Sequence, residues 1–81
     1  MNQPTFSLLR NLLFEVGFLD HSVLGKYARF DHPEEPDTWV LMRNYRPDDP
    51  VTQADLITAR RLLDERGILS ADDFDERMRD R

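Results

Sequence analysis

The sequence predicts an α+β domain of order α-β-β-β-α, with a three-stranded antiparallel sheet, two helices on one face and a short C-terminal helix. Apolar residues recur at helical spacing near both ends of the chain but alternate with polar residues between them. Glycines and prolines stand where these periods change. The 81 residues suit a single domain, 1–81, and we expect residues 79–81 to form a frayed tail.

The first helix is expected over residues 5–16. One apolar stripe repeats there every three or four positions and comprises Phe6, Leu9, Leu13 and Val16. Pro4 is well placed near a helix start, and Gly17 follows the last periodic residue, as is typical of a helix C-terminus.

Three strands are expected near residues 19–24, 26–32 and 38–45, separated by Gly25 and by a turn rich in proline and acidic residues. Alternation places Ala28, Phe30, Val40 and Met42 on the face that carries the helices. The outer face then receives Tyr27, Arg29, Trp39, Leu41, Arg43 and Tyr45. Outward Trp and Leu side chains indicate a surface that is either covered or an interaction site.

Two further helices follow the loop at residues 46–50. Thr52 is a helix-start residue, and the apolar period over 53–66 ends before Gly67. Ser70 repeats the start signal before a short helix anchored by Phe74 and Met78. We expect the cations of the second helix to pair within it, Arg60 with Asp64 and Arg61 with Glu65.

Charge and composition restrict the possible partners. Residues 1–47 carry a net charge of −1 and residues 48–81 one of −4, which gives −5 for the chain. Nucleic-acid binding draws on an excess of Lys and Arg, so RNA is a disfavoured partner. The chain has no cysteine, and we expect no cofactor. No apolar run has membrane-spanning length and the N-terminus lacks a basic signal region, so we expect a soluble cytoplasmic protein without membrane contact.

Five short segments, in this order and spacing, resemble the HicA (YcfA-like) family of small toxins. They are Val16-Gly17-Phe18, Phe30-Asp31-His32-Pro33, Trp39-Val40-Leu41-Met42, Leu62-Leu63-Asp64-Glu65-Arg66-Gly67-Ile68 and the short helix with Phe74. The resemblance covers nearly the whole chain. It implies the fold of double-stranded-RNA-binding domains and the activity of an mRNA interferase from a toxin–antitoxin pair.

The family's catalytic motif is altered here. In the family, Gly-Ser-His opens the middle strand and the histidine serves in RNA cleavage. Gly25 matches, but Lys26 stands in place of the serine and Tyr27 in place of the histidine. The resemblance therefore implies a HicA-like domain that has lost its catalytic imidazole.

Tyr27 has two interpretations. It could replace the histidine only if Lys26 and Arg29 strongly lowered its pKa, because a tyrosine ordinarily titrates near pH 10. We prefer an outward aromatic residue that pairs across the sheet with Trp39 or Leu41. The two histidines, His21 and His32, show no metal-ligand spacing, so we expect no metal site.

Two classes of function follow. The preferred one is a non-catalytic protein-interaction module that binds a protein partner, or a second copy, through the outer sheet face. The alternative is an RNA-binding or RNA-cleaving toxin that uses substituted residues. An unrelated α+β domain is a third possibility. For the outer face, the competing interpretation is that Phe74 and Met78 fold over it and make Trp39 a core residue.

Overall fold

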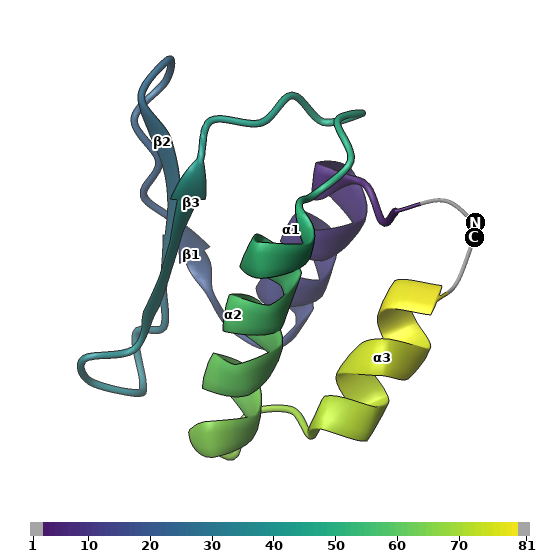
Figure 1. Ribbon diagram of the computed structural model, residues 1–81. Coiled ribbons are helices and arrows are strands. Elements are labelled where there is room, and N and C mark those ends of the chain that lie inside the picture. Colours follow the sequence, from purple (N-terminus) through teal and green to yellow (C-terminus); the bar gives the residue numbers. More distant parts are fainter. Residues whose placement is uncertain (1–2, 80–81) are drawn as a thin grey trace.

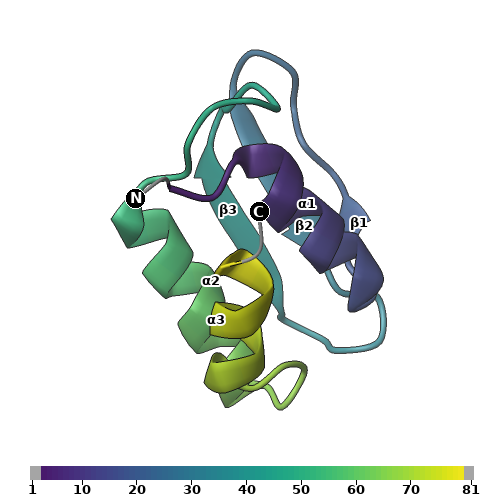
Figure 2. The ribbon, with the colours of Figure 1, turned by 90° about the vertical axis from the view of Figure 1, so that its right-hand side faces the viewer.

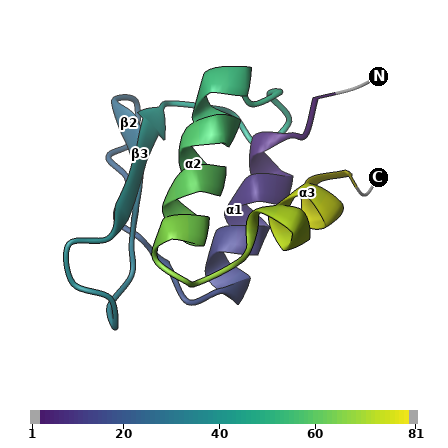
Figure 3. The ribbon, with the colours of Figure 1, turned by 60° about the horizontal axis from the view of Figure 1, so that its bottom comes forward.

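The computed structural model describes residues 3–79 and shows the predicted α+β fold (Figure 1). The elements are listed here in chain order: α1 (Phe6–Glu15), β1 (Leu19–Asp20), β2 (Tyr27–Asp31), β3 (Trp39–Arg43), α2 (Gln53–Glu65) and α3 (Ala71–Arg79). The strands form one antiparallel sheet of order β1-β2-β3. Helices α1 and α2 cover one face of this sheet, as predicted, and α3 forms a further layer beyond them (Figures 2 and 3).

The helix starts follow the local signals of the sequence. Thr5 caps α1 by accepting a hydrogen bond from the Leu8 amide at 3.3 Å. Thr52 does the same for α2, where it accepts from the Asp55 amide at 3.3 Å. The Ser70 hydroxyl accepts from the Asp73 amide at 3.2 Å at the start of α3. The predicted starts of the second and third helices are confirmed.

The strands are shorter than predicted, and β1 has only two residues. The Ser22 hydroxyl accepts the Arg29 amide at 2.9 Å, so a side chain replaces the strand partner that continued pairing would supply. The chain then turns through Gly25, whose φ of +79° suits glycine. Residues 21–26 are therefore a loop with one isolated bridge, Val23 to Tyr27, rather than the continuous hairpin that was expected.

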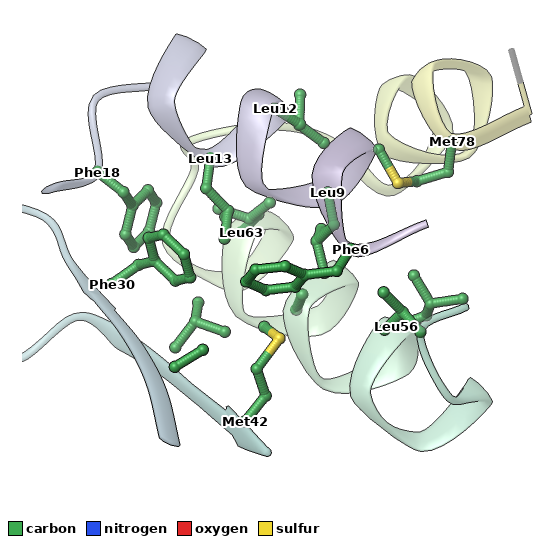
Figure 4. Close-up of a cluster of buried hydrophobic side chains, with 14 of the residues drawn as sticks. Phe6, Leu9, Leu12, Leu13, Phe18, Phe30, Met42, Leu56, Leu63 and Met78 are labelled. Atoms are coloured by element: carbon green, nitrogen blue, oxygen red, sulfur yellow. The ribbon is translucent and has the colours of Figure 1, made fainter. Parts of the chain in front are cut away.

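The core lies between the sheet and the helix pair (Figure 4). The four predicted inward residues of β2 and β3 are all buried: Ala28, Phe30, Val40 and Met42. Phe30 is fully buried, and the ring of Phe6 from α1 lies 6.2 Å away between centroids. Alternation along the strands thus predicted correctly which face carries the helices.

Helix α3 packs on α1 and α2, on the side away from the sheet (Figure 3). Phe74 and Met78 are buried there, so the interpretation that they cover the outer sheet face is wrong. The last turn of α3 includes Arg79, which was expected in the frayed tail, and residues 80–81 lie outside the described part of the chain. Gln3 and Arg79 line the same surface cavity of about 510 Å³, so the two described ends are neighbours.

Ion pairs tie α3 to both neighbouring helices. Arg60 of α2 binds Asp75 of α3 through two hydrogen bonds, at 2.9 and 3.1 Å. The hydrogen bond and the charge of Asp75 raise the pKa of Arg60 above its ordinary value. Arg77 pairs with Glu15 of α1. The predicted pairs within α2 are wrong, because α3 offers Arg60 a carboxylate in bidentate geometry and no i,i+4 ion pair forms among residues 53–65.

Candidate interaction surface on the sheet

The outer face of the sheet is built from alternate residues of its strands. Tyr27 lies opposite Arg43, Arg29 opposite Leu41, and Asp31 opposite Trp39. Leu19 of β1 lies opposite Asp31 and belongs to the same face. We call this set the outer face: Leu19, Tyr27, Arg29, Asp31, Trp39, Leu41 and Arg43.

Exposed apolar side chains concentrate in the sheet layer. Among the described residues, six of the eight exposed large hydrophobic side chains belong to residues 19–41, and only Phe14 and Ile57 lie on helices. The six are Leu19, Val23, Leu24, Tyr27, Trp39 and Leu41. Trp39 is 46% exposed, Leu41 54% and Leu24, at the loop tip, 97%. Such clustering is unusual on a surface that faces only water.

Arg29 organises the centre of this face. Its Nε donates to Asp31 Oδ1 at 2.9 Å, and its guanidinium carbon lies 5.2 Å from the centroid of the Trp39 ring. The other oxygen of Asp31 lies 3.4 Å from Nδ1 of His21. The carboxylate therefore holds the guanidinium over the indole, which orders two residue types that commonly anchor protein interfaces.

The position that resembles the family's catalytic histidine carries no acid–base group of comparable chemistry. Tyr27 and Lys26 are both exposed, at the end of β2 beside the loop. The guanidinium of Arg29 is engaged by Asp31, on the side of Arg29 away from Tyr27. Among residues 3–79 the Tyr27 hydroxyl has no hydrogen-bond partner. Lys26 is then the cation nearest in sequence, and its side chain is exposed.

Both histidines have other roles. His32 Nδ1 accepts from the Glu34 amide at 3.2 Å, so its proton lies on Nε2, which donates to the Val16 carbonyl at 3.0 Å. Its ring meets the Phe18 ring edge-on at 5.0 Å between centroids. Two segments of the HicA resemblance, at residues 16–18 and 30–33, thus meet in one structural contact. Within residues 3–79, no three His, Cys, Asp or Glu side chains cluster as a metal site would require.

Tyr45 does not belong to the outer face, and that prediction is wrong. Strand β3 ends at Arg43, and the chain then turns towards the helices. The Tyr45 ring stacks on Phe6 at 5.5 Å, and its hydroxyl donates to Asp55 Oδ2 at 2.6 Å. The same hydroxyl accepts the Thr52 amide at 3.0 Å. Tyr45 therefore fixes the start of α2 to the core.

Three exposed apolar residues of the sheet layer are not among the predicted surface residues: Leu19, Val23 and Leu24. Leu19 lies on the outer face because it pairs with Asp31. The sequence alone does not give the strand register that establishes this pairing. Val23 and Leu24 were expected in a strand, whereas Val23 forms only an isolated bridge and Leu24 lies in the turn that follows it. Their exposure extends the apolar surface beyond the outer face.

Comparison with known proteins gives no relative from which to transfer a function. No family model, no curated protein and no solved structure matches the chain. None of the helices within residues 3–79 has the length and apolar character needed to cross a bilayer.

Proposed function

We propose that this chain is a non-catalytic protein-interaction module, a HicA-like domain without the catalytic histidine, whose outer face binds a protein partner or a second copy. The main support is the concentration of exposed apolar side chains in the sheet layer, which α3 leaves uncovered. The Arg29–Trp39 pair supports the proposal, since Trp, Tyr and Arg supply most of the energy in many protein interfaces.

The charges favour protein over RNA as the partner. Binding to a phosphate backbone needs several cations that are free to contact it. Arg29 is engaged by Asp31, Arg60 by Asp75 and Arg77 by Glu15. The chain as a whole carries −5, so a phosphate backbone would also meet a repulsive field.

Site-specific photo-crosslinking tests the proposal. A benzophenone amino acid replaces Leu41 on the outer face or, as the matched control, exposed Glu65 on α2. In cells that naturally make the protein, we expect protein adducts from position 41 only. Adding Trp39→Ser to the position-41 protein should reduce the adducts while changing the free energy of unfolding by less than about 1 kcal/mol, because Trp39 is half exposed.

The identity of the adducts decides the outcome. A defined protein, or a second copy, that mass spectrometry recovers repeatedly from position 41 supports the proposal. Nuclease-sensitive adducts would support the RNA-binding alternative instead. Equal adducts from positions 41 and 65, or none from 41, would contradict an outer-face interface.

We further expect that the purified protein neither cleaves total RNA nor binds it tightly at physiological salt. The reasons are that Tyr27 stands in place of the imidazole and that the chain carries a net charge of −5. Incubation with RNA and a filter-binding titration across salt measure both properties. Cleavage that disappears in Tyr27→Phe would overturn this expectation. The converse variant, Lys26→Ser with Tyr27→His, should gain little activity, because phosphate-positioning cations are still missing.

A further inference from the structure

Strand β3 is an edge strand whose free side carries unpaired backbone groups. The Arg29 carbonyl accepts a hydrogen bond from the His21 amide at 2.7 Å, and the Arg29 amide donates to the Ser22 hydroxyl. Both backbone groups of Arg29 therefore point towards the β1 side of β2. Its partner Leu41 must therefore point its own N–H and C=O away from β2. At the other end of the strand pair, the His32 amide donates to the Thr38 carbonyl at 3.0 Å. Thr38 therefore points its backbone towards β2, and the next residue, Trp39, points its backbone away from β2.

The same alternation applies to Trp39 and Arg43. By this register the backbone groups of Trp39, Leu41 and Arg43 point away from β2, and among the described residues none of them makes a hydrogen bond outside the sheet. Natural sheets usually protect such an edge with a proline, a bulge or an inward charge, and β3 has none of these. Figure 1 views the sheet from the β3 side, and no segment of residues 3–79 crosses that edge.

The charge at the Arg43 end of this edge has the opposite sign to that of the whole chain. Arg43 ends β3, and its cross-strand neighbour Tyr27 follows Lys26. Neither cation pairs with an acidic side chain within residues 3–79. A chain of net charge −5 thus presents two unpaired cations at the end of its open strand. An acidic segment is the complementary partner.

A second copy fits this edge poorly. Antiparallel pairing of two β3 strands about a two-fold axis places both α2 helices on the same side of the joined sheet. Helix α2 packs against β3 and extends past it at its N-terminal end (Figure 2). The two α2 helices would then compete for the same space. An isolated extended segment brings no helix with it.

We propose that an acidic extended segment of a partner protein adds to β3 as a fourth, antiparallel strand of the sheet. This inference rests on the proposed function and specifies its partner. The added strand pairs its backbone with Trp39, Leu41 and Arg43, and its alternate side chains extend the outer face. Opposite Arg43 it places Asp or Glu, and opposite Leu41 and Trp39 it places Val or Ile.

The probe is the peptide acetyl-Glu-Thr-Val-Thr-Val-Thr-Glu-amide, followed by NMR of the labelled protein. We expect saturable shifts at the amides of Trp39, Leu41 and Arg43 with peptide at up to about 1 mM. N-methylation at both valines, whose N–H groups face β3, should weaken binding about tenfold. N-methylation at two threonines, whose N–H groups face away, is the matched control and should weaken it far less.

Three variants of the protein test the same backbone and side-chain contacts on β3. Leu41→Pro removes an N–H that makes no internal hydrogen bond, so an edge strand tolerates it, and binding should weaken about tenfold. Leu41→Ser keeps the N–H and should weaken binding only about threefold. Arg43→Glu should reverse the preference between this peptide and its analogue with lysines at both ends, by about threefold to fivefold.

Absence of saturable shifts, or equal binding of the two N-methylated peptides, would overturn the inference. So would self-association of the wild type that Leu41→Pro abolishes, because the occupant would then be a second copy. The N-methylated peptides keep the test valid if Leu41→Pro fails to fold. Photo-adducts at position 41 together with a negative peptide test would leave the outer face as the interface and remove only strand addition.

Discussion

Phe30→Ala is expected to lower the free energy of unfolding by about 3–5 kcal/mol. The Phe30 ring is completely buried, and the rings of Phe6 and Phe14 lie 6.2 and 5.9 Å from it between centroids. The strand cannot move to fill the cavity, because β2 pairs with both neighbours. Since small domains have about 5–15 kcal/mol of total stability, this loss threatens folding itself.

Urea unfolding followed by far-UV circular dichroism measures this loss. The matched control is Leu41→Ala on the neighbouring strand, where the side chain is more than half exposed and the change should stay below about 1 kcal/mol. Equal losses in the two variants would show that the sheet does not bury Phe30 in the way described. A variant that is unfolded without denaturant would agree with the upper end of the range.

Gly17→Ala is expected to cost about 1–3 kcal/mol, for two reasons that can be separated. Gly17 has a φ of +106°, which residues with a side chain rarely adopt. A Cβ atom there would also stand 2.9 Å from His32 Nε2, the atom that donates to the Val16 carbonyl. The substitution therefore strains the backbone and displaces the His32 ring from its hydrogen bond.

Gly25→Ala is the matched control, because its φ is +79° but no atom lies within 4 Å of the added Cβ. We expect thermal unfolding to show a larger loss for Gly17→Ala than for Gly25→Ala. In a His32→Ala background, the extra cost at Gly17 should largely disappear, since the clashing ring is gone. Additive losses from Gly17→Ala and His32→Ala would contradict the contact between the two residues.

The sequence was sufficient for the elements whose signals are local. Thr52 and Ser70 mark helix starts by hydrogen bonds that span only three residues, so these boundaries could be predicted. The alternation of side chains along a strand is equally local, and it predicted correctly which residues of β2 and β3 point inward and which point outward.

Contacts distant in sequence were not predictable in the same way. The spacing in α2 would allow Arg60 to pair with Asp64. Arg60 binds Asp75 instead, because α3 folds back beside α2. Tyr45 continues the alternation of β3 in sequence, yet its hydroxyl is needed at the start of α2. In both cases tertiary packing supplied a better hydrogen-bond partner than the local pattern offered.

The candidate site was predicted in part. Tyr27, Arg29, Trp39, Leu41 and Arg43 lie on one face, as the pleat requires. The sequence could not indicate which edge of the sheet stays open, because that depends on strand order and on where α3 lies. The HicA resemblance stays a prediction, and two of its segments have a structural explanation in the contact of His32 with Gly17 and Phe18.

Because Gln3 and Arg79 lie near each other, the two ends of the described chain can be re-engineered together. Both line a cavity whose other lining residues belong mainly to α2 and α3, and α3 lies on the side of the helices away from the sheet (Figure 1), so a reporter fused near either end stays clear of the sheet. Ends this close can also be joined by a short linker, and a new opening can be placed at the exposed loop around Leu24 and Gly25. The fold is therefore suited to circular permutation and to insertion into a surface loop of another protein.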